Sequence, residues 1–180
     1  APISMTRRAF VHGGIVGISG LALASCTRGI ISRNDIEITR RTFTIPNLPA
    51  AFRGKTITLL SDIHSSPFMS LEDLKRLAAT VNELQSDIIL VPGDFVTSHK
   101  DEIPPFVEAM ADLSAPLGIY GCTGNHDYYT GVDQVSKAIG EINFKLLRNE
   151  HAKITLNGES LYLIGVDDDD AKTITNYVDG

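Results

Sequence analysis

The sequence predicts an α/β fold in which strands alternate with helices. Short apolar runs alternate along the chain with amphipathic, helix-like stretches, as in the units that build a largely parallel sheet. Three of the apolar runs end in short polar motifs, at residues 62–64, 93–94 and 124–127. Because the carboxyl ends of parallel strands share one edge of a sheet, we expect the three motifs to lie close together.

Local patterns predict the strands. Partial alternation of apolar and polar residues indicates a strand at 36–45, after a polar tether that begins at residue 27. Buried apolar runs predict four further strands: 56–61, 88–91, 117–122 and 144–147. The turn pair Asn157-Gly158 predicts a hairpin formed by residues 153–156 and 160–166.

Three helices are predicted between these strands: 70–85, 104–113 and 132–139. Ser70 is a suitable N-cap for the first, whose leucine, alanine and valine residues recur on one face. Prolines begin the second, and Gly140 ends the third. Each of the first two helices fills the interval between two polar motifs.

The length and composition suit one globular domain with a substantial core. The chain has 180 residues, of which 43% are hydrophobic and 21% are charged. The net charge of −6 is uneven, since residues 1–55 carry eight Lys or Arg against two Asp or Glu. A basic first segment suits a position near an anionic membrane. No basic stripe with aromatic residues follows, which argues against nucleic-acid binding.

The first 26 residues have the order of an export signal. Thr6–Val11 contains a twin-arginine pair, and Gly13–Ala24 is an uncharged apolar run. That run is shorter than the ~20 residues that span a bilayer but suits a signal-peptide core. Leu23–Cys26 resembles a bacterial lipobox, in which Cys26 would become the lipidated N-terminus. An ordinary buried helix is the alternative. The signal predicts twin-arginine export to the bacterial cell envelope and membrane anchoring through Cys26.

The three motifs, in this order, resemble the calcineurin-like metallophosphoesterases, whose pattern begins D-x-H, G-D, G-N-H-[DE]. The matching residues are Asp62 and His64, Gly93 and Asp94, and Gly124–Asp127. One motif alone would be weak, but three in order, each after a strand-like run, are specific. The resemblance spans roughly residues 36–170, and its flanking residues are similar to a branch of small exported or membrane-associated phosphoesterases. It implies a four-layer α-β-β-α sandwich.

The resemblance also implies a dinuclear metal centre. Asp62 and His64 would bind the first ion together with Asp94, which would bridge both ions, and Asn125 would bind the second through its amide oxygen. Such ligands suit divalent or trivalent Mn, Fe, Zn or Co. Capping of the strand ends is the structural alternative for these residues.

Two further residues would act in catalysis by the same resemblance. His126 would contact the phosphoryl oxygen or the leaving group, as an acid or an electrostatic stabiliser. Asp127 would orient the imidazole of His126, although a plain turn residue is the alternative. A metal-bridging hydroxide would attack phosphorus in line. Gly93 and Gly124 are expected only to permit tight turns.

Several other residues near the motifs have a structural interpretation. Tyr128 and Tyr129 would line the substrate cleft or only pack. His99 is expected to be solvated rather than catalytic, and His151 to be a surface or structural residue. The acidic run 167–170 is interpreted as a solvated loop, with an approach of Asp167 and Asp168 to the cleft as the alternative.

The chain departs from the family pattern after Asp127. That pattern continues with a lone histidine and a G-H-x-H segment that complete both metal sites. Here His151 is the only later histidine, and no G-H-x-H occurs. We therefore expect an N-terminal part of a metallophosphoesterase: a signal at 1–26, a tether and first strand at 27–55, and the start of the catalytic domain at 56–180.

The expected function is metal-dependent hydrolysis of a phosphodiester or phosphomonoester. The substrate would be a small-molecule, lipid-linked or cell-wall phosphoester. A non-catalytic metal-binding envelope lipoprotein, or an inactive fragment of such an enzyme, is the alternative. No G-x-S-x-G elbow and no phosphate-binding P-loop occur, which argues against a serine hydrolase and a P-loop nucleotidase.

Overall fold

The computed structural model describes residues 35–168. The chain divides into two compact units, Ala1–Thr42 and Phe43–Gly180. In the first unit, residues 35–42 are exposed and form neither helix nor strand. The predicted signal, including the twin arginines and Cys26, lies outside the described residues. Among the described residues, none of the helices combines the length and the apolar character needed to cross a membrane.

The strand predicted at 36–45 is not formed. These residues have no regular secondary structure, and Phe43 and Ile45 are 77% and 57% exposed. Alternation specifies a strand only where a neighbouring strand completes the hydrogen bonds and one face is covered. In the described part of the chain no strand pairs with this segment.

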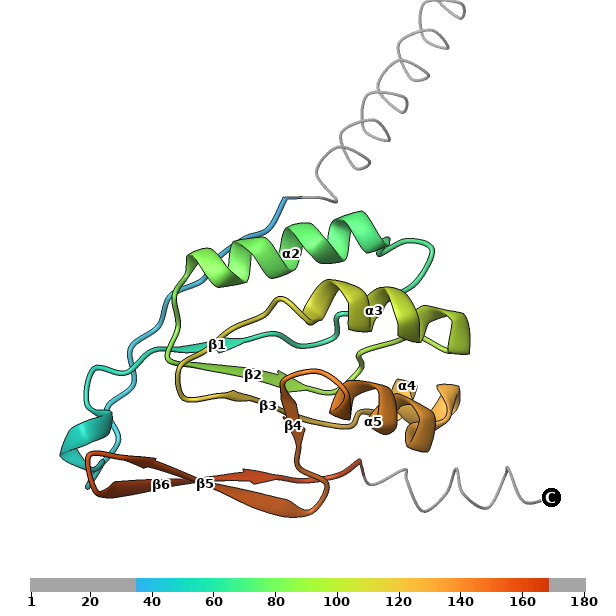
Figure 1. Ribbon diagram of the computed structural model, residues 1–180. Coiled ribbons are helices and arrows are strands. Elements are labelled where there is room, and N and C mark those ends of the chain that lie inside the picture. Colours follow the sequence, from blue (N-terminus) through green and yellow to red (C-terminus); the bar gives the residue numbers. More distant parts are fainter. Residues whose placement is uncertain (1–34, 169–180) are drawn as a thin grey trace, which may run out of the picture. The chain divides into compact units, whose positions relative to one another are not determined.

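The second unit contains a four-stranded parallel sheet in the order β1-β2-β3-β4 (Figure 1). Its strands are β1 (Ile57–Leu59), β2 (Ile88–Pro92), β3 (Ile119–Cys122) and β4 (Phe144–Leu146). Leu59 lies opposite Leu90, and Pro92 lies opposite Cys122. The ends of β1, β2 and β3, which precede the three polar motifs, therefore meet at one edge of the sheet.

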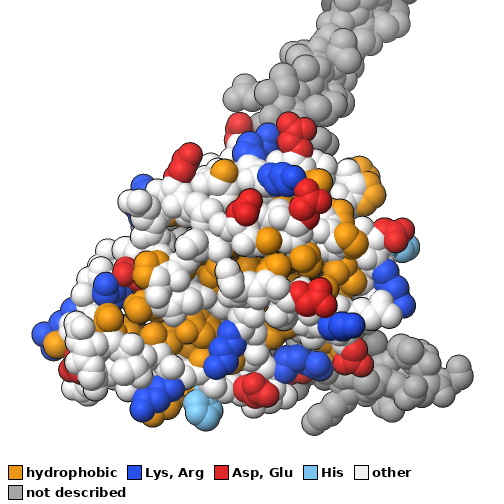
Figure 2. Space-filling model, viewed as in Figure 1, with side chains coloured by type: hydrophobic (Ala, Val, Ile, Leu, Met, Phe, Trp, Pro, Cys, Tyr) orange, Lys and Arg blue, Asp and Glu red, His pale blue; other side chains and the backbone are white. Residues whose placement is uncertain are grey.

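Three longer helices cover one face of this sheet: α2 (Leu71–Glu83), α3 (Ile103–Met110) and α5 (Val132–Gly140) (Figure 1). Ser70 and Asp73 form a capping box at the start of α2, and prolines begin α3. The outer face of α2 carries charged side chains, which gather over this helix in Figure 2. Two short 3₁₀ helices, η1 (Ala50–Phe52) and η2 (Lys100–Glu102), lie in the connections.

A two-stranded antiparallel hairpin packs against the opposite face of the sheet. It consists of β5 (Glu150–Leu156) and β6 (Glu159–Gly165). Its turn residues Asn157 and Gly158 both have positive φ, as the sequence pair predicts. β5 begins three residues earlier than predicted.

The strand β2 is buried on both faces. Ile89 and Val91 pack under the helices, whereas Ile88 and Leu90 pack with Ile154 of the hairpin. This arrangement explains why β2 is continuously apolar rather than alternating. The α/β class is thus confirmed, with layers of helices, parallel sheet and hairpin in the described residues.

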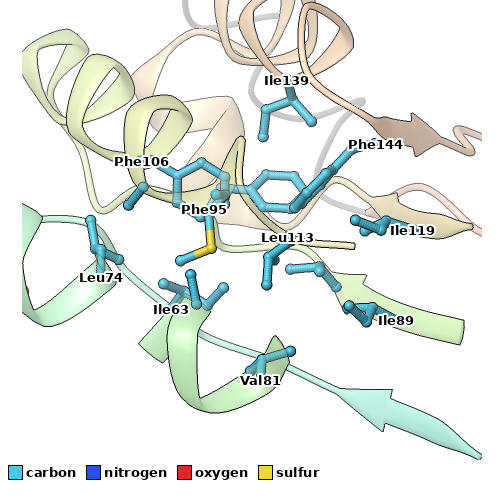
Figure 3. Close-up of a cluster of buried hydrophobic side chains, with 14 of the residues drawn as sticks. Ile63, Leu74, Val81, Ile89, Phe95, Phe106, Leu113, Ile119, Ile139 and Phe144 are labelled. Carbon is cyan, nitrogen blue, oxygen red and sulfur yellow. The ribbon is translucent and has the colours of Figure 1, made fainter. Parts of the chain in front are cut away.

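The larger core cluster reaches the polar edge of the sheet through Phe95. Its ring lies 5.3 Å, between centroids, from that of Phe106 on α3, which in turn contacts Phe144 (Figure 3). Phe95 is fully buried and directly follows Asp94. Packing of this side chain therefore helps to fix the loop that carries the second motif.

Candidate metal centre

Asp94 connects the loops that follow β1, β2 and β3. The N–H of His64 donates to the carbonyl oxygen of Asp94 at 3.0 Å, and the N–H of Ser65 donates to that of Phe95 at 3.0 Å. On the other side, the N–H of His126 donates to Oδ1 of Asp94 at 3.1 Å. The three motifs that are distant in the sequence thus form one hydrogen-bonded unit.

Three residues of this unit have a left-handed backbone. The φ angles of Asp62, His64 and Asp94 are 54°, 49° and 54°. Few residues other than glycine adopt this region, and each such residue costs on the order of 1–3 kcal/mol. Strain of this kind persists where surrounding contacts enforce it, which is common at functional sites.

The two motif glycines allow the loops to touch. A Cβ on Gly93 would collide with the backbone of Gly124, and a Cβ on Gly124 would collide with Oδ1 of Asp94. Gly93 also has a φ of 88°, as expected for a tight turn. Gly124 has an ordinary φ, so close approach rather than turn geometry requires it.

His64, Asp94 and His126 offer a group of metal ligands. One ligand atom from each lies within 4.8 Å of the others. Nε2 of His64 is 3.6 Å from Oδ2 of Asp94, and the two imidazole rings are 4.5 Å apart. Nδ1 of His64 is buried and has no hydrogen-bond partner in the described part of the chain. One carboxylate and two imidazole rings, one of which has a buried nitrogen without a partner in the described residues, together fit a divalent transition-metal ion.

Asp62 and Asn125 lie at the border of this group. Asp62 is 67% exposed, accepts a hydrogen bond from Ser61, and has Oδ1 4.0 Å from Nε2 of His64. Nδ2 of Asn125 donates to the hydroxyl of Tyr129 at 3.3 Å. An amide whose nitrogen donates in this way presents its oxygen as the remaining ligand atom.

The third motif lies on a short helix that the sequence analysis missed. Residues Asn125–Thr130 form α4, which follows Gly124 directly. The segment is too short, and too poor in aliphatic residues, to produce a helical apolar period. The helix presents Asn125, His126 and Tyr129 from a single rigid turn.

The carboxylate of Asp127 binds backbone rather than the imidazole of His126. It is completely buried and accepts the N–H groups of Asp94 (2.9 Å), Phe95 (3.0 Å), Val96 (3.4 Å) and Gly124 (2.9 Å). Burial raises the pKa of Asp127 to about 6, against the opposing effect of these hydrogen bonds. The contact differs from the predicted role, because Asp127 fixes the loop of the bridging candidate Asp94.

The imidazole of His126 is instead paired with a backbone carbonyl. Its Nδ1 lies 2.5 Å from the carbonyl oxygen of Thr97. Because that oxygen can only accept, the ring carries its proton on Nδ1, and the neutral ring has a lone pair on Nε2. The sequence analysis did not identify Thr97, since a backbone acceptor has no signature in residue types.

Asp167 forms a second polar cluster behind α4. It accepts hydrogen bonds from Tyr128 (2.7 Å), from Nε of Arg148 (3.1 Å) and from Thr123, and Nη2 of Arg148 donates to the Tyr128 hydroxyl at 2.7 Å. Burial alone would raise the pKa of Asp167, but these hydrogen bonds hold it below its ordinary value.

For Asp167, the predicted solvated loop is therefore wrong, whereas residues 169–170 lie outside the described range. Tyr128 is buried, which agrees with a packing role. Tyr129 is 53% exposed, and its ring contacts the ring of His126. His99 and His151 are exposed, as predicted.

Comparisons with known proteins match the region that contains the three motifs. The family model described as calcineurin-like phosphoesterase matches residues 55–177. A transmembrane protein with metallophosphoesterase domain from Danio rerio is 29% identical over 170 residues, covering 92% of this chain and 37% of the relative. The uncharacterized metallophosphoesterase YkuE from Bacillus subtilis is 30% identical over 180 residues, covering 91% of this chain and 60% of the relative.

A third relative is named for an enzymatic activity. The UDP-2,3-diacylglucosamine pyrophosphatase LpxG from Chlamydia trachomatis is 34% identical over 102 residues, covering 56% of this chain and 31% of the relative. The chain thus spans between 31% and 60% of the lengths of these three relatives.

Proposed function

This chain belongs to the calcineurin-like phosphoesterase family, and from that premise we propose that it hydrolyses phosphoester bonds with a pair of bound metal ions. The observation that supports the proposal best is the meeting of His64, Asp94 and His126 at one edge of the sheet. Two metal ions would supply charge neutralisation and an activated water for attack on phosphorus.

The proposed ligands divide between two ions. Asp62, His64 and Asp94 would hold the first, and Asp94 and Asn125 would hold the second. Asp94 is suited to the shared position because the N–H of His126 fixes Oδ1, and Oδ2 faces His64. Hydrogen bonding of this kind orients a ligating carboxylate before the ion binds.

Although His126 belongs to the group of possible metal ligands, we assign it to the substrate, and Asn125 rather than His126 to the second ion. With Nδ1–H held by the Thr97 carbonyl, Nε2 is the ring atom left for the substrate, and in the protonated imidazolium its N–H would contact the phosphoryl oxygen or protonate the leaving group. Asp127 would contribute indirectly, by fixing the backbone of residues 94–96 beneath the site.

We propose an envelope phosphoester as the substrate class. One relative is named as a pyrophosphatase of UDP-2,3-diacylglucosamine, a lipid-bearing sugar nucleotide, and another as a transmembrane protein. The basic segment at 1–55 and the lipobox-like Cys26 would place this protein at a membrane, near lipid-linked substrates. Twin-arginine export and lipidation belong to the same proposal.

The proposal is tested by metal analysis together with turnover. The protein is purified with Mn²⁺, its bound metal is measured by elemental analysis, and bis(p-nitrophenyl) phosphate and p-nitrophenyl phosphate are assayed. Two ions per chain would show that the residues present complete both sites without the later histidines of the family pattern, and we expect turnover that Asp94→Ala abolishes, while Asp112→Ala, at an exposed position, changes neither. Fewer ions would contradict the dinuclear centre.

His126→Ala separates an enzyme from a metal-binding protein. We expect it to lower turnover by about 10²- to 10⁴-fold, the range for a general acid, with the metal content unchanged. Metal binding without turnover of either substrate in the unmodified protein would instead favour a non-catalytic envelope protein.

A further inference from the structure

We propose that Glu102 is a positioning residue for His126: its buried carboxylate shapes the loop whose Thr97 carbonyl holds the imidazole. The catalytic consequence rests on the proposed function, whereas the positioning itself does not. Glu102 lies five residues beyond Thr97 and belongs to none of the three motifs.

The Glu102 carboxylate binds three consecutive backbone N–H groups. Its Oε2 accepts from Thr97 at 2.8 Å, from Ser98 at 2.8 Å and from His99 at 3.1 Å. The residue is 7% exposed, so these hydrogen bonds are shielded from water. Burial would raise the pKa of Glu102, but the three N–H groups outweigh it and hold the pKa below its ordinary value. An ionised carboxylate at neutral pH is the acceptor that this arrangement requires.

Capping of the following helix explains only part of this arrangement. His99 is the N-cap of η2 and Glu102 is its third residue, so the bond to the His99 N–H is an ordinary capping contact. Thr97 and Ser98 precede the N-cap, and their N–H groups belong to the loop. Two of the three hydrogen bonds therefore order the loop that faces His126.

Asp127 and Glu102 together hold the entire loop. Asp127 accepts the N–H groups of residues 94–96, and Glu102 accepts those of residues 97–99. Six consecutive N–H groups are thus bound by two buried carboxylates from different parts of the chain. The first carboxylate fixes the segment of Asp94, and the second fixes the segment that ends at the acceptor of His126.

Glu102 is also connected to the loop of the other histidine. Its carbonyl oxygen accepts a hydrogen bond from Oγ of Ser65 at 2.8 Å, and Ser65 directly follows His64. Oγ1 of Thr97 donates to the carbonyl oxygen of Ser65 at 3.3 Å. The Glu102 backbone and the loop that its side chain orders therefore meet the first motif as well.

The test compares the full-length protein with Glu102→Gln, which keeps the side-chain size but removes the charge. Glu108→Gln is the matched control, because Glu108 is a partly exposed glutamate on α3 that pairs with Lys75. The metal-free proteins are labelled with ¹⁵N-histidine, and ¹H–¹⁵N spectra report the tautomer of His126. Amide exchange is measured at residues 97–99.

In the unmodified protein and in Glu108→Gln we expect the Nδ1–H tautomer of His126 and protected amides. In Glu102→Gln we expect a second tautomer to become populated and exchange at 97–99 to accelerate by about tenfold, as for one lost hydrogen bond. With Mn²⁺ bound, kcat should fall by about 10- to 100-fold while KM changes little.

A folded Glu102→Gln protein with an unchanged His126 tautomer and unchanged exchange would overturn the proposal. If that variant does not fold, Glu102→Asp takes its place, since it keeps the charge but is too short to reach all three N–H groups, and the same outcomes decide. Absence of turnover in the unmodified protein would count against the proposed function alone, because both spectroscopic measurements use metal-free protein.

Discussion

At the scale of single residues, Asp94 shows how the site depends on individual hydrogen bonds between the loops. Its backbone accepts from His64, its carboxylate accepts from His126, and its own N–H is bound by Asp127. The sequence motif predicts that these residues share a site. It does not reveal that the contacts among them run largely through backbone groups, which every residue type possesses.

Substitution of Gly124 tests the close approach of the loops. In Gly124→Ala the new Cβ would collide with Asp94, so we expect a loss of about 1–3 kcal/mol in the free energy of unfolding and a loss of bound metal. Urea denaturation and elemental analysis measure the two effects. Gly140→Ala is the control, because a Cβ there meets no atom within 4 Å. An unchanged metal content in Gly124→Ala would contradict the packing argument.

Among the elements, α4 is held at the sheet edge by the cluster of Tyr128, Arg148 and Asp167. This cluster joins the third motif to the end of β6 and to the residues just before β5. The hairpin therefore supports the site as well as covering the sheet. No pattern in the sequence predicts this pairing, because its members are separated by 19 to 39 residues.

Adjacent tyrosines on α4 allow a matched test of that cluster. Tyr128→Phe removes a hydroxyl that is bonded to both Arg148 and Asp167, so we expect a loss of about 1–3 kcal/mol in the free energy of unfolding. Tyr129→Phe, at the exposed neighbour, should change it by no more than about 0.5 kcal/mol. Equal effects in a denaturation experiment would show that the cluster does not stabilise α4.

The start of the sheet has its own pH-dependent contact. Asp87, just before β2, accepts hydrogen bonds from Lys55 at 2.8 Å and from the N–H of Thr56 at 2.8 Å, just before β1. These contacts, that of Lys55 first, hold the pKa of Asp87 below its ordinary value. The folded state therefore gains stability above the unfolded pKa, near 4, and loses it as the pH falls through the lower folded pKa.

Asp87→Asn should reveal this dependence. At pH 7 we expect the variant to be less stable by about 0.5–1.5 kcal/mol. The difference from the unmodified protein should shrink as the pH falls below about 4 and should disappear only below the lower folded pKa, where the native carboxylate is protonated too. Urea denaturation at several pH values measures the difference in the free energy of unfolding. A difference that stays constant with pH would contradict the lowered pKa of Asp87.

For the molecule as a whole, metal binding should be coupled to folding. The left-handed residues of the site and the buried, unpartnered Nδ1 of His64 exist in this arrangement only in the native state. An ion that binds at this site therefore stabilises the native state over the unfolded one. At a free Mn²⁺ concentration about 100 times Kd, we expect about 2.7 kcal/mol of stabilisation and a corresponding rise in Tm.

EDTA should reverse this rise, and Asp94→Ala should abolish it. Thermal unfolding with and without Mn²⁺ measures the effect in both proteins. An equal rise in Asp94→Ala would place the bound ion elsewhere.

The sequence by itself determined the family, the α/β class and most elements of the second unit. Its three motifs follow apolar runs, and the order of strands fixes the edge at which such motifs meet. These features are local, so residue types and spacing are enough to predict them. The strand predicted at 36–45 fails for the opposite reason, because a strand requires a partner that local alternation does not provide.

Only the tertiary structure decided how the site is held together. Asp127 binds backbone and not His126, the Thr97 carbonyl holds the imidazole, Glu102 orders the loop, and Asp167 is half-buried. Each is a contact between segments whose separation in the sequence carries no information about their distance in space. Burial then gives these contacts their strength, because water no longer competes for the same donors and acceptors.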